Sequence, residues 1–269
     1  MPQSDTPRPH RSLISGQRFY RLRKFCQHLL DPFARLNRHT LTVRDAASLH
    51  HAMGWQLAPD LDFDHLLLHQ TAVDVNHRPL RDAEVIAGAA RNLAPGIILE
   101  IGTGAGHTTA LLARNAPAAR IYTVNILPEE IDAGGTYVTD APSREEIGAF
   151  YRRQGCTNIT QLYANTATWQ PDLDPIDIAF IDGCHDADFV YRDTLLVLRH
   201  SHPGTVILWH DFSPSLVDRH PWIADVCLGV QQLFHNRILS GPIYHLQDSW
   251  VGMHTVRPSD LTGHAVPQP

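Results

Sequence analysis

The chain has 269 residues, 43% of them hydrophobic and 19% charged, so it can bury a substantial core in one large domain or in one domain with a smaller attachment. No stretch approaches the roughly eighteen consecutive apolar residues of a membrane span, and the N-terminus lacks the apolar centre of a secretion signal, so we expect a cytoplasmic protein. The four cysteines are far apart and form no C-x-x-C pair, which argues against a disulfide framework or a cysteine zinc site.

The charge is unevenly placed along the chain. Residues 1–50 hold nine Arg or Lys against three Asp, a net of +6, whereas the whole chain carries −6. A basic arm can bind nucleic acid, but Arg-rich N-termini on acidic proteins are more often solvated tails or subunit contacts. We therefore expect no nucleic-acid partner. We interpret residues 1–80 as a basic arm and helical extension, with a short helix at 19–30 and no clear sheet pattern, and as a candidate for contacts in a homo-oligomer.

From residue 80 onward, helical and strand-like segments alternate, which predicts a parallel sheet with helices on both faces. Helices are expected over 81–93, from the glycine turn to 114, and over 143–154, 186–200 and 223–234. Strands are expected over 97–101, 120–125, 159–164, 176–182, 205–212, 243–246 and 250–256. The fold class is thus α/β, a doubly wound, mostly parallel, seven-stranded Rossmann-like sheet. It occupies a domain of residues 81–257, and we expect a disordered tail over 258–269.

A glycine-rich turn follows the first of these strands, in Glu100-Ile-Gly102-Thr-Gly104-Ala-Gly106. Glycines let the backbone approach a ligand closely, and the helix that follows offers unpaired N–H groups, so the turn predicts a nucleotide-like ligand. A dinucleotide fingerprint would need its third glycine or alanine at position 107, which is a histidine. The pattern therefore does not favour a nicotinamide cofactor.

The turn resembles the first motif of the class I S-adenosylmethionine-dependent methyltransferases, an acidic residue followed by G-x-G-x-G. The resemblance covers residues 80–256, and "ILEIGTGAGHTTALLA" is similar to the small-molecule O-methyltransferases of that superfamily. It implies that the loop passes under the amino-acid part of S-adenosylmethionine, that Glu100 supports the loop, and that Asn125 lies at the ribose and Asn165 at the adenine. The implied cofactor set is Glu100, Gly102, Thr103, Gly104, Gly106, Asn125, Asn165 and Asp182.

The chain departs from that family at both asparagines, where acidic residues are usual. An amide oxygen offers a neutral hydrogen bond in place of a charge-assisted one, so we expect weaker cofactor binding. A changed cofactor or a loss of activity is the alternative that this departure leaves open.

A second group of polar residues follows two later strands. The fourth strand ends in "AFIDGCHD", with Asp182, His185 and Asp186, and the fifth ends in "TVILWHDF", with His210 and Asp211. Ligands bind at the carboxyl ends of parallel strands, so we expect these groups to meet there. Asp186 also suits the N-cap of the next helix. A carboxylate at the end of an apolar strand is costly unless it is paired, ligated or used in chemistry.

Two chemistries fit this group. In the first, Asp182, His210 and Asp211 hold a divalent cation that lowers the pKa of a substrate hydroxyl, as implied by the resemblance to catechol and antibiotic-sugar O-methyltransferases. The imidazole makes Mg²⁺ less suitable and favours Mn²⁺ or Zn²⁺. In the second, His210 or His185 is a general base beside Asp182. The segment also resembles a bacterial methyltransferase group with a D-G-x-H segment and a final H-D, and both chemistries stay open.

The sequence thus predicts an S-adenosylmethionine-dependent methyltransferase that acts on a hydroxyl of a small molecule or glycoside. We expect the acceptor pocket to be walled by the segment 126–141, by the N-terminal extension near His77 and Arg78, and by Trp209 and Phe212. The alternatives are a nicotinamide-dependent oxidoreductase and a catalytically silent protein with a cofactor-binding fold.

Overall fold

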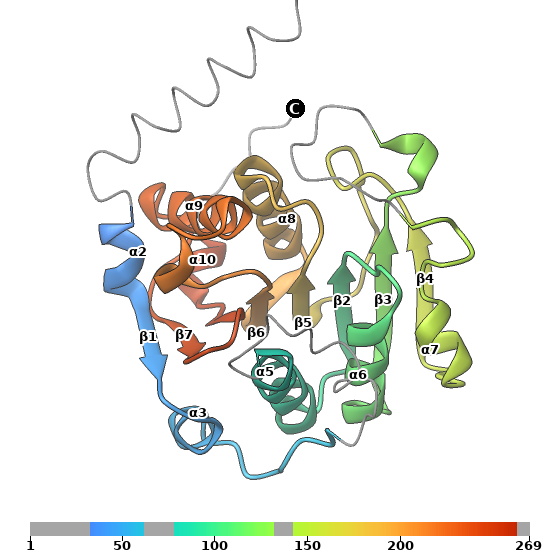
Figure 1. Ribbon diagram of the computed structural model, residues 1–269, viewed down its shortest axis with the longest axis horizontal. Helices are drawn as coiled ribbons and strands as arrows, with labels where there is room; N and C mark the ends of the chain where they lie inside the picture. Colours follow the sequence, from blue (N-terminus) through green and yellow to red (C-terminus); the bar gives the residue numbers. More distant parts are fainter. Residues whose placement is uncertain (1–32, 62–77, 132–141, 263–269) are drawn as a thin grey trace, which may run out of the picture.

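The computed structural model describes residues 33–61, 78–131 and 142–262, which form an α/β fold around one eight-stranded sheet (Figure 1). The strand order is β1-β7-β8-β6-β5-β2-β3-β4. All neighbouring strands pair in parallel except β8, which runs antiparallel to β6 and β7. The strands are β1 (Thr40–Val43), β2 (Ile97–Ile101), β3 (Arg120–Asn125), β4 (Ile159–Tyr163), β5 (Ile176–Ile181), β6 (Ser201–Trp209), β7 (Ile243–Leu246) and β8 (Gly252–Thr255).

Helices cover both faces of this sheet, as expected for a doubly wound fold (Figure 1). One face packs on α8 and α9, and the other packs on α5 and α6. The central strands β2 and β5 are therefore almost entirely buried, as is the second half of β6 (205–209), which explains their largely apolar sequences. The helices are α2 (Ala34–His39), α3 (Ala46–Met53), α5 (Arg78–Leu93), α6 (His107–Asn115), α7 (Ala149–Arg153), α8 (Ala187–Arg199), α9 (Pro221–His235) and α10 (Pro258–Leu261), with short 3₁₀ helices η1 (Pro128–Glu130) and η2 (Pro214–Leu216).

The Rossmann-like class is confirmed, but the sheet has eight strands and not seven. The additional strand, β1, comes from the segment in which we expected no sheet pattern, and it pairs in parallel with β7 at the edge. None of its four residues is fully buried, so it carries no strong hydrophobic signal. The predicted helix at 19–30 lies outside the described residues.

Three other expectations are corrected. The helix expected over 143–154 is limited to α7, because Gly148 adopts a left-handed conformation (φ 70°) immediately before it. Strand β6 begins at Ser201 and shifts register between the residues opposite Ile176 and Ile178, ahead of the expected start at 205. The expected disorder of the tail is wrong for α10, whose Asp260 is buried.

No helix in the described part of the chain combines the length and the apolar character that crossing a membrane requires.

Candidate active site

The glycine loop connects β2 to α6 at the carboxyl edge of the sheet. Gly102 has a φ of 95°, and a Cβ at this position would lie 1.9 Å from the carbonyl oxygen of Asp182. Only glycine therefore lets the loop pass so close to the end of β5. Gly104 also has a positive φ, 49°, but a Cβ there would meet open space. The loop thus packs against Asp182 on one side and leaves its backbone accessible at Gly104.

Glu100 lies beneath this loop and is completely buried. Its Oε2 accepts hydrogen bonds of 2.5 Å from the hydroxyls of Thr109 and Thr123. Because the Thr123 hydroxyl donates to Glu100, it must accept from Thr103 in their 2.7 Å contact, and Thr103 in turn accepts from Gln161 Nε2. Burial raises the pKa of Glu100 to about 8, although both threonine hydroxyls act against the rise. Glu100 therefore supports the loop from below through Thr103.

Asn125, at the end of β3, also holds the loop. Its Oδ1 accepts from the backbone N–H groups of Thr103 at 3.0 Å and Gly104 at 3.1 Å, and its Nδ2 donates to the carbonyl of Ile126. Both lone pairs of the amide oxygen are thus used within the protein. A contact from Asn125 to a ribose stays a prediction, and so does the adenine contact of Asn165, whose Oδ1 accepts from the N–H of Ala167.

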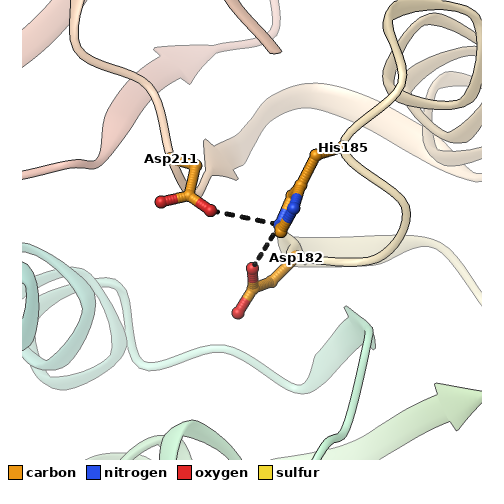
Figure 2. Close-up of side chains that lie close together, drawn as sticks. All are labelled: Asp182, His185 and Asp211. Carbon is orange, nitrogen blue, oxygen red and sulfur yellow. Dashed lines mark ion pairs between the residues drawn. The ribbon is translucent and has the colours of Figure 1, made fainter. Parts of the chain in front are cut away.

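The ends of β5 and β6 meet as expected, since the two strands are parallel neighbours. Figure 2 shows Asp182, His185 and Asp211 pointing toward one another. His185 Nε2 lies 3.1 Å from Asp211 Oδ2 and 3.6 Å from Asp182 Oδ1. One ligand atom from each of these residues lies within 4.8 Å of the other two, a spacing that can hold a metal ion. The metal set predicted from sequence had His210 in the place of His185.

His210 lies between two carboxylates. Its Nδ1 is 3.1 Å from Asp182 Oδ1, and its Nε2 is 3.5 Å from Asp82 Oδ2. Asp82 comes from α5, is buried, and also pairs with Arg78 at 2.7 Å. Sequence reasoning missed Asp82. The sequence did contain a signal for it. Asp82, Ile86 and Ala89 recur at helical spacing, so Asp82 lies on the apolar, inward-facing stripe of its helix, where an acidic residue is unusual.

Asp182, His185, His210 and Asp211 form an acid and histidine cluster in which each group shifts the pKa of its neighbours. Burial disfavours the cationic imidazole of His210, but the charges of Asp182 and Asp211 outweigh it and raise the pKa of His210 well above its usual value. The pKa of His185 is also raised, because the hydrogen bond to Asp182 and the charges of Asp211 and Asp182 outweigh the effect of burial. Burial alone would raise the pKa of Asp182, yet the two imidazoles hold it well below its usual range. The cluster therefore stabilises imidazolium and carboxylate charges together.

The backbone just after the end of β6 has an unusual conformation at Asp211. Asp211 has a φ of 52°, a left-handed conformation that non-glycine residues adopt rarely and that Asp tolerates better than most. The turn directs its carboxylate back toward His185. The expected N-cap position of Asp186 before α8 is confirmed, although its side chain forms no capping bond. Trp209 and Phe212 were expected to wall the acceptor pocket, but both are fully buried in the core.

Residues 99–212 match the sequence model of a family described as a methyltransferase domain. Residues 99–212 are thus similar to a methyltransferase domain. The match spans the glycine loop and both strand ends of the cluster, and it does not support the nicotinamide-dependent alternative. No curated protein matches the chain significantly.

Solved structures resemble this methyltransferase domain and its surroundings at low sequence identity. The O-methyltransferase NovP is 14% identical, with a TM-score of 0.52 over 66% of this chain and 80% of its own. TomG, an O-methyltransferase from Streptomyces achromogenes involved in tomaymycin synthesis and solved with S-adenosylmethionine, is 18% identical, with a TM-score of 0.49 over 82% and 98%. The methyltransferase PaMTH1 from Podospora anserina, solved with S-adenosylhomocysteine, is 14% identical, with a TM-score of 0.43 over 93% and 98%. The likeness to NovP supports the fold.

Proposed function

We propose that the protein transfers a methyl group from S-adenosylmethionine to a hydroxyl of a small molecule. The observation that carries this proposal is the contact between the glycine loop and the acid and histidine cluster, made where Gly102 packs on Asp182. A methyl donor above the loop would lie beside groups able to activate a hydroxyl. The name of the similarly folded NovP, an O-methyltransferase, agrees with an oxygen acceptor.

The residues of the loop fit the proposed cofactor. Gly104 leaves space for a ligand at the backbone, and α6 begins directly after the loop with its N–H groups toward the same edge. When bound, S-adenosylmethionine supplies a methyl group on a positively charged sulfur. The protein's part is to align the acceptor oxygen with that carbon and to exclude water, which contributes much of the acceleration in such displacements.

Asp182, His185 and Asp211 would hold a divalent cation in this site. Their donor atoms are mutually close, and the Nε2 of His185 faces a carboxylate oxygen of Asp211 at 3.1 Å and one of Asp182 at 3.6 Å. Two carboxylates with one imidazole suit Mn²⁺ or Zn²⁺ better than Mg²⁺. Such an ion would act as a Lewis acid that lowers the pKa of the acceptor hydroxyl.

General-base catalysis by His210 is the second candidate. His210 lies beside the same cluster, but the charges of Asp182 and Asp211 raise its pKa and so favour the protonated imidazole, which cannot accept the hydroxyl proton. The metal-assisted form is therefore the one that we propose, with His210 placing Asp182 through their 3.1 Å contact.

Titration calorimetry with S-adenosylhomocysteine tests the cofactor assignment. We expect saturable binding to the wild-type protein and none of NAD(H) or NADP(H). Gly104→Val should weaken binding at least tenfold, since it adds a branched side chain at φ 49° in the open part of the loop. Gly54→Val, at φ 68° and likewise facing open space but distant in sequence from the loop, is the matched control and should leave the affinity unchanged. Absence of S-adenosylhomocysteine binding would contradict the proposal and favour the silent alternative.

A further inference from the structure

A cavity of about 680 Å³ lies beside the acid and histidine cluster, on the side away from the glycine loop. It is lined by residues of β1 and β7, by η2 and by the segment that precedes β8. Arg78 and Trp250 line it, and both bind Asp82, through the guanidinium at 2.7 Å and through the backbone N–H at 2.6 Å. Asp82 in turn faces His210. One carboxylate thus separates the cavity from the cluster, and the volume is in the range of small-molecule sites.

Most of the residues that line this cavity have polar side chains. Only Pro214, Leu216 and Trp250 have mainly apolar ones. The other lining residues carry hydroxyl, amide, imidazole, guanidinium or carboxylate groups, several of them from the N-terminal extension and η2. Such walls offer many donors and acceptors at short spacing. A flat apolar ligand would leave most of them without partners, and each unsatisfied buried group has a cost.

His245 on β7 is the most informative of the lining residues. It is 4% exposed, and its Nε2 lies 3.0 Å from the carbonyl oxygen of Ser249. A carbonyl only accepts, so Nε2 must carry the hydrogen, which leaves Nδ1 as an acceptor in the neutral ring. This Nδ1 is buried and has no hydrogen-bond partner among the described residues. Burial also lowers the pKa of His245, in agreement with a neutral ring. A residue that lines the cavity therefore has an acceptor nitrogen without a donor among the described residues.

We propose that this cavity binds the methyl acceptor, and that the acceptor is a polyhydroxylated molecule of which one hydroxyl donates a hydrogen bond to His245 Nδ1. This inference rests on the proposed function and names its substrate class. A second hydroxyl of the same molecule extends past Arg78 and Asp82 to the cluster. There the acceptor oxygen bonds to the methyl carbon, the carbon–sulfur bond breaks with its electron pair on sulfur, and the hydroxyl proton passes to a group of the cluster. The loss of the hydroxyl proton leaves a neutral methyl ether.

The test uses the full-length protein saturated with S-adenosylhomocysteine. Methyl α-D-glucopyranoside, methyl α-L-rhamnopyranoside and myo-inositol serve as polyhydroxylated probes, and catechol serves as the flat one, with binding followed by ligand-observed NMR. We expect saturable binding of at least one polyol and none of catechol. His245→Phe should weaken polyol binding about tenfold, as loss of one acceptor predicts, whereas His245→Asn, whose Oδ1 lies near the position of Nδ1, should retain most of it.

Two measurements keep the outcome interpretable. Both variants lose the bond to Ser249, so the difference between their polyol affinities reports on the acceptor at the Nδ1 position. The affinity for S-adenosylhomocysteine should stay unchanged in both variants. In ¹⁵N-labelled wild-type protein, the His245 Nδ1 resonance should shift when the polyol is added, which requires no variant. His202→Asn is the matched control, because His202 pairs with Asp177 at the opposite, amino ends of β5 and β6.

Failure of every polyol to bind, preferential binding of catechol, or unchanged polyol affinity in His245→Phe with no shift of the Nδ1 resonance would each overturn the inference. If S-adenosylhomocysteine still binds in that case, the proposed methyltransferase function stands and only the acceptor assignment is lost. If S-adenosylhomocysteine does not bind either, both are lost.

Discussion

At the residue scale, the two histidines of the cluster have different surroundings. His210 has a carboxylate on each side of its ring, Asp182 near Nδ1 and Asp82 near Nε2. His185 directs a single nitrogen, Nε2, at Asp182 and Asp211. One ligand atom of His185 lies within 4.8 Å of one each from Asp182 and Asp211, whereas the two ring nitrogens of His210 face different carboxylates on opposite sides of the ring. His185 is therefore better placed than His210 to complete a metal site.

This difference leads to a prediction about paired variants. His185→Asn should weaken Mn²⁺ binding at least tenfold by calorimetry, because it removes a direct ligand, whereas His210→Asn should change it only a few-fold. Both should lose most methyl transfer, and EDTA should abolish wild-type activity until Mn²⁺ is restored. Full activity in excess EDTA would instead support the general-base role, and loss of Mn²⁺ binding from His210→Asn alone would mean that His210, and not His185, is the ligand.

The cluster was only partly predictable from sequence. Asp182, His210 and Asp211 could be brought together because they end neighbouring parallel strands, and a sheet fixes where such ends meet. Asp82 could not be added, because its position depends on how α5 packs across the sheet edge. His185 was identified as a catalytic candidate but not as a ligand, since the turn between Asp182 and His185 determines where its ring points.

At the element scale, predictability followed burial. Strands β2, β3 and β7 have the bounds expected from sequence, because each has buried residues with strong strand preference along most of its length. The edge strand β1 has no buried face to mark it, and α10 has only four residues, too few to show a periodic pattern. Both elements are held by tertiary contacts that local sequence does not encode.

Helix α10 shows how such a contact works. Asp260 Oδ2 accepts from the backbone N–H of Arg257 at 2.9 Å and lies 3.1 Å from His254 Nε2, while Oδ1 accepts from the Ser240 hydroxyl at 2.6 Å. Burial raises the pKa of Asp260, but these hydrogen bonds outweigh it and lower the pKa below the usual value. One carboxylate thus fastens the last described helix to β8 and to the segment before β7.

We expect Asp260→Ala to lower the free energy of unfolding by about 2–4 kcal/mol, because His254 and the Ser240 hydroxyl lose a buried partner. The loss should be largest above the ordinary carboxyl pKa and should shrink as the pH falls through the lower folded-state pKa, where the wild-type carboxylate is itself protonated. Urea unfolding at pH 7 and pH 3 measures both. Thr262→Ala, exposed just beyond the helix, should have little effect, and equal stability of the Asp260 variant and this control would refute the anchoring role.

At the scale of the whole molecule, the strand order places three candidate sites side by side at the carboxyl ends of the central strands and beside β7 and β1. The glycine loop lies at the end of β2, the acid and histidine cluster at the ends of β5 and β6, and the cavity at the ends of β7 and β1. The sequence predicted the first two because they depend on motifs. The cavity depends on loops and on β1, whose arrangement no motif encodes. Its polar walls could therefore be recognised only from the structure.

The stability of the whole fold should also depend on pH through one buried acid. Asp193 on α8 is 1% exposed, and neither of its carboxylate oxygens has a well-formed hydrogen bond within the described residues. Burial raises its pKa to about 7, against a smaller lowering by the Thr166 hydroxyl. Since the folded state keeps the proton to higher pH than the unfolded state, the stability that it contributes is complete below the unfolded pKa and is lost as the pH rises to about 7.

Asp193→Asn imitates the protonated side chain at every pH, so it should remove this loss. We expect the difference in free energy of unfolding between the variant and the wild type to move in favour of the variant by at least about 1 kcal/mol from pH 4.5 to pH 8. Urea unfolding across that range measures it. Asp188→Asn, exposed on the same helix, should shift stability by a constant small amount. Parallel stability curves for Asp193→Asn and the wild type would mean that Asp193 ionises in the folded protein as readily as in the unfolded chain, and that water or an unseen partner compensates its burial.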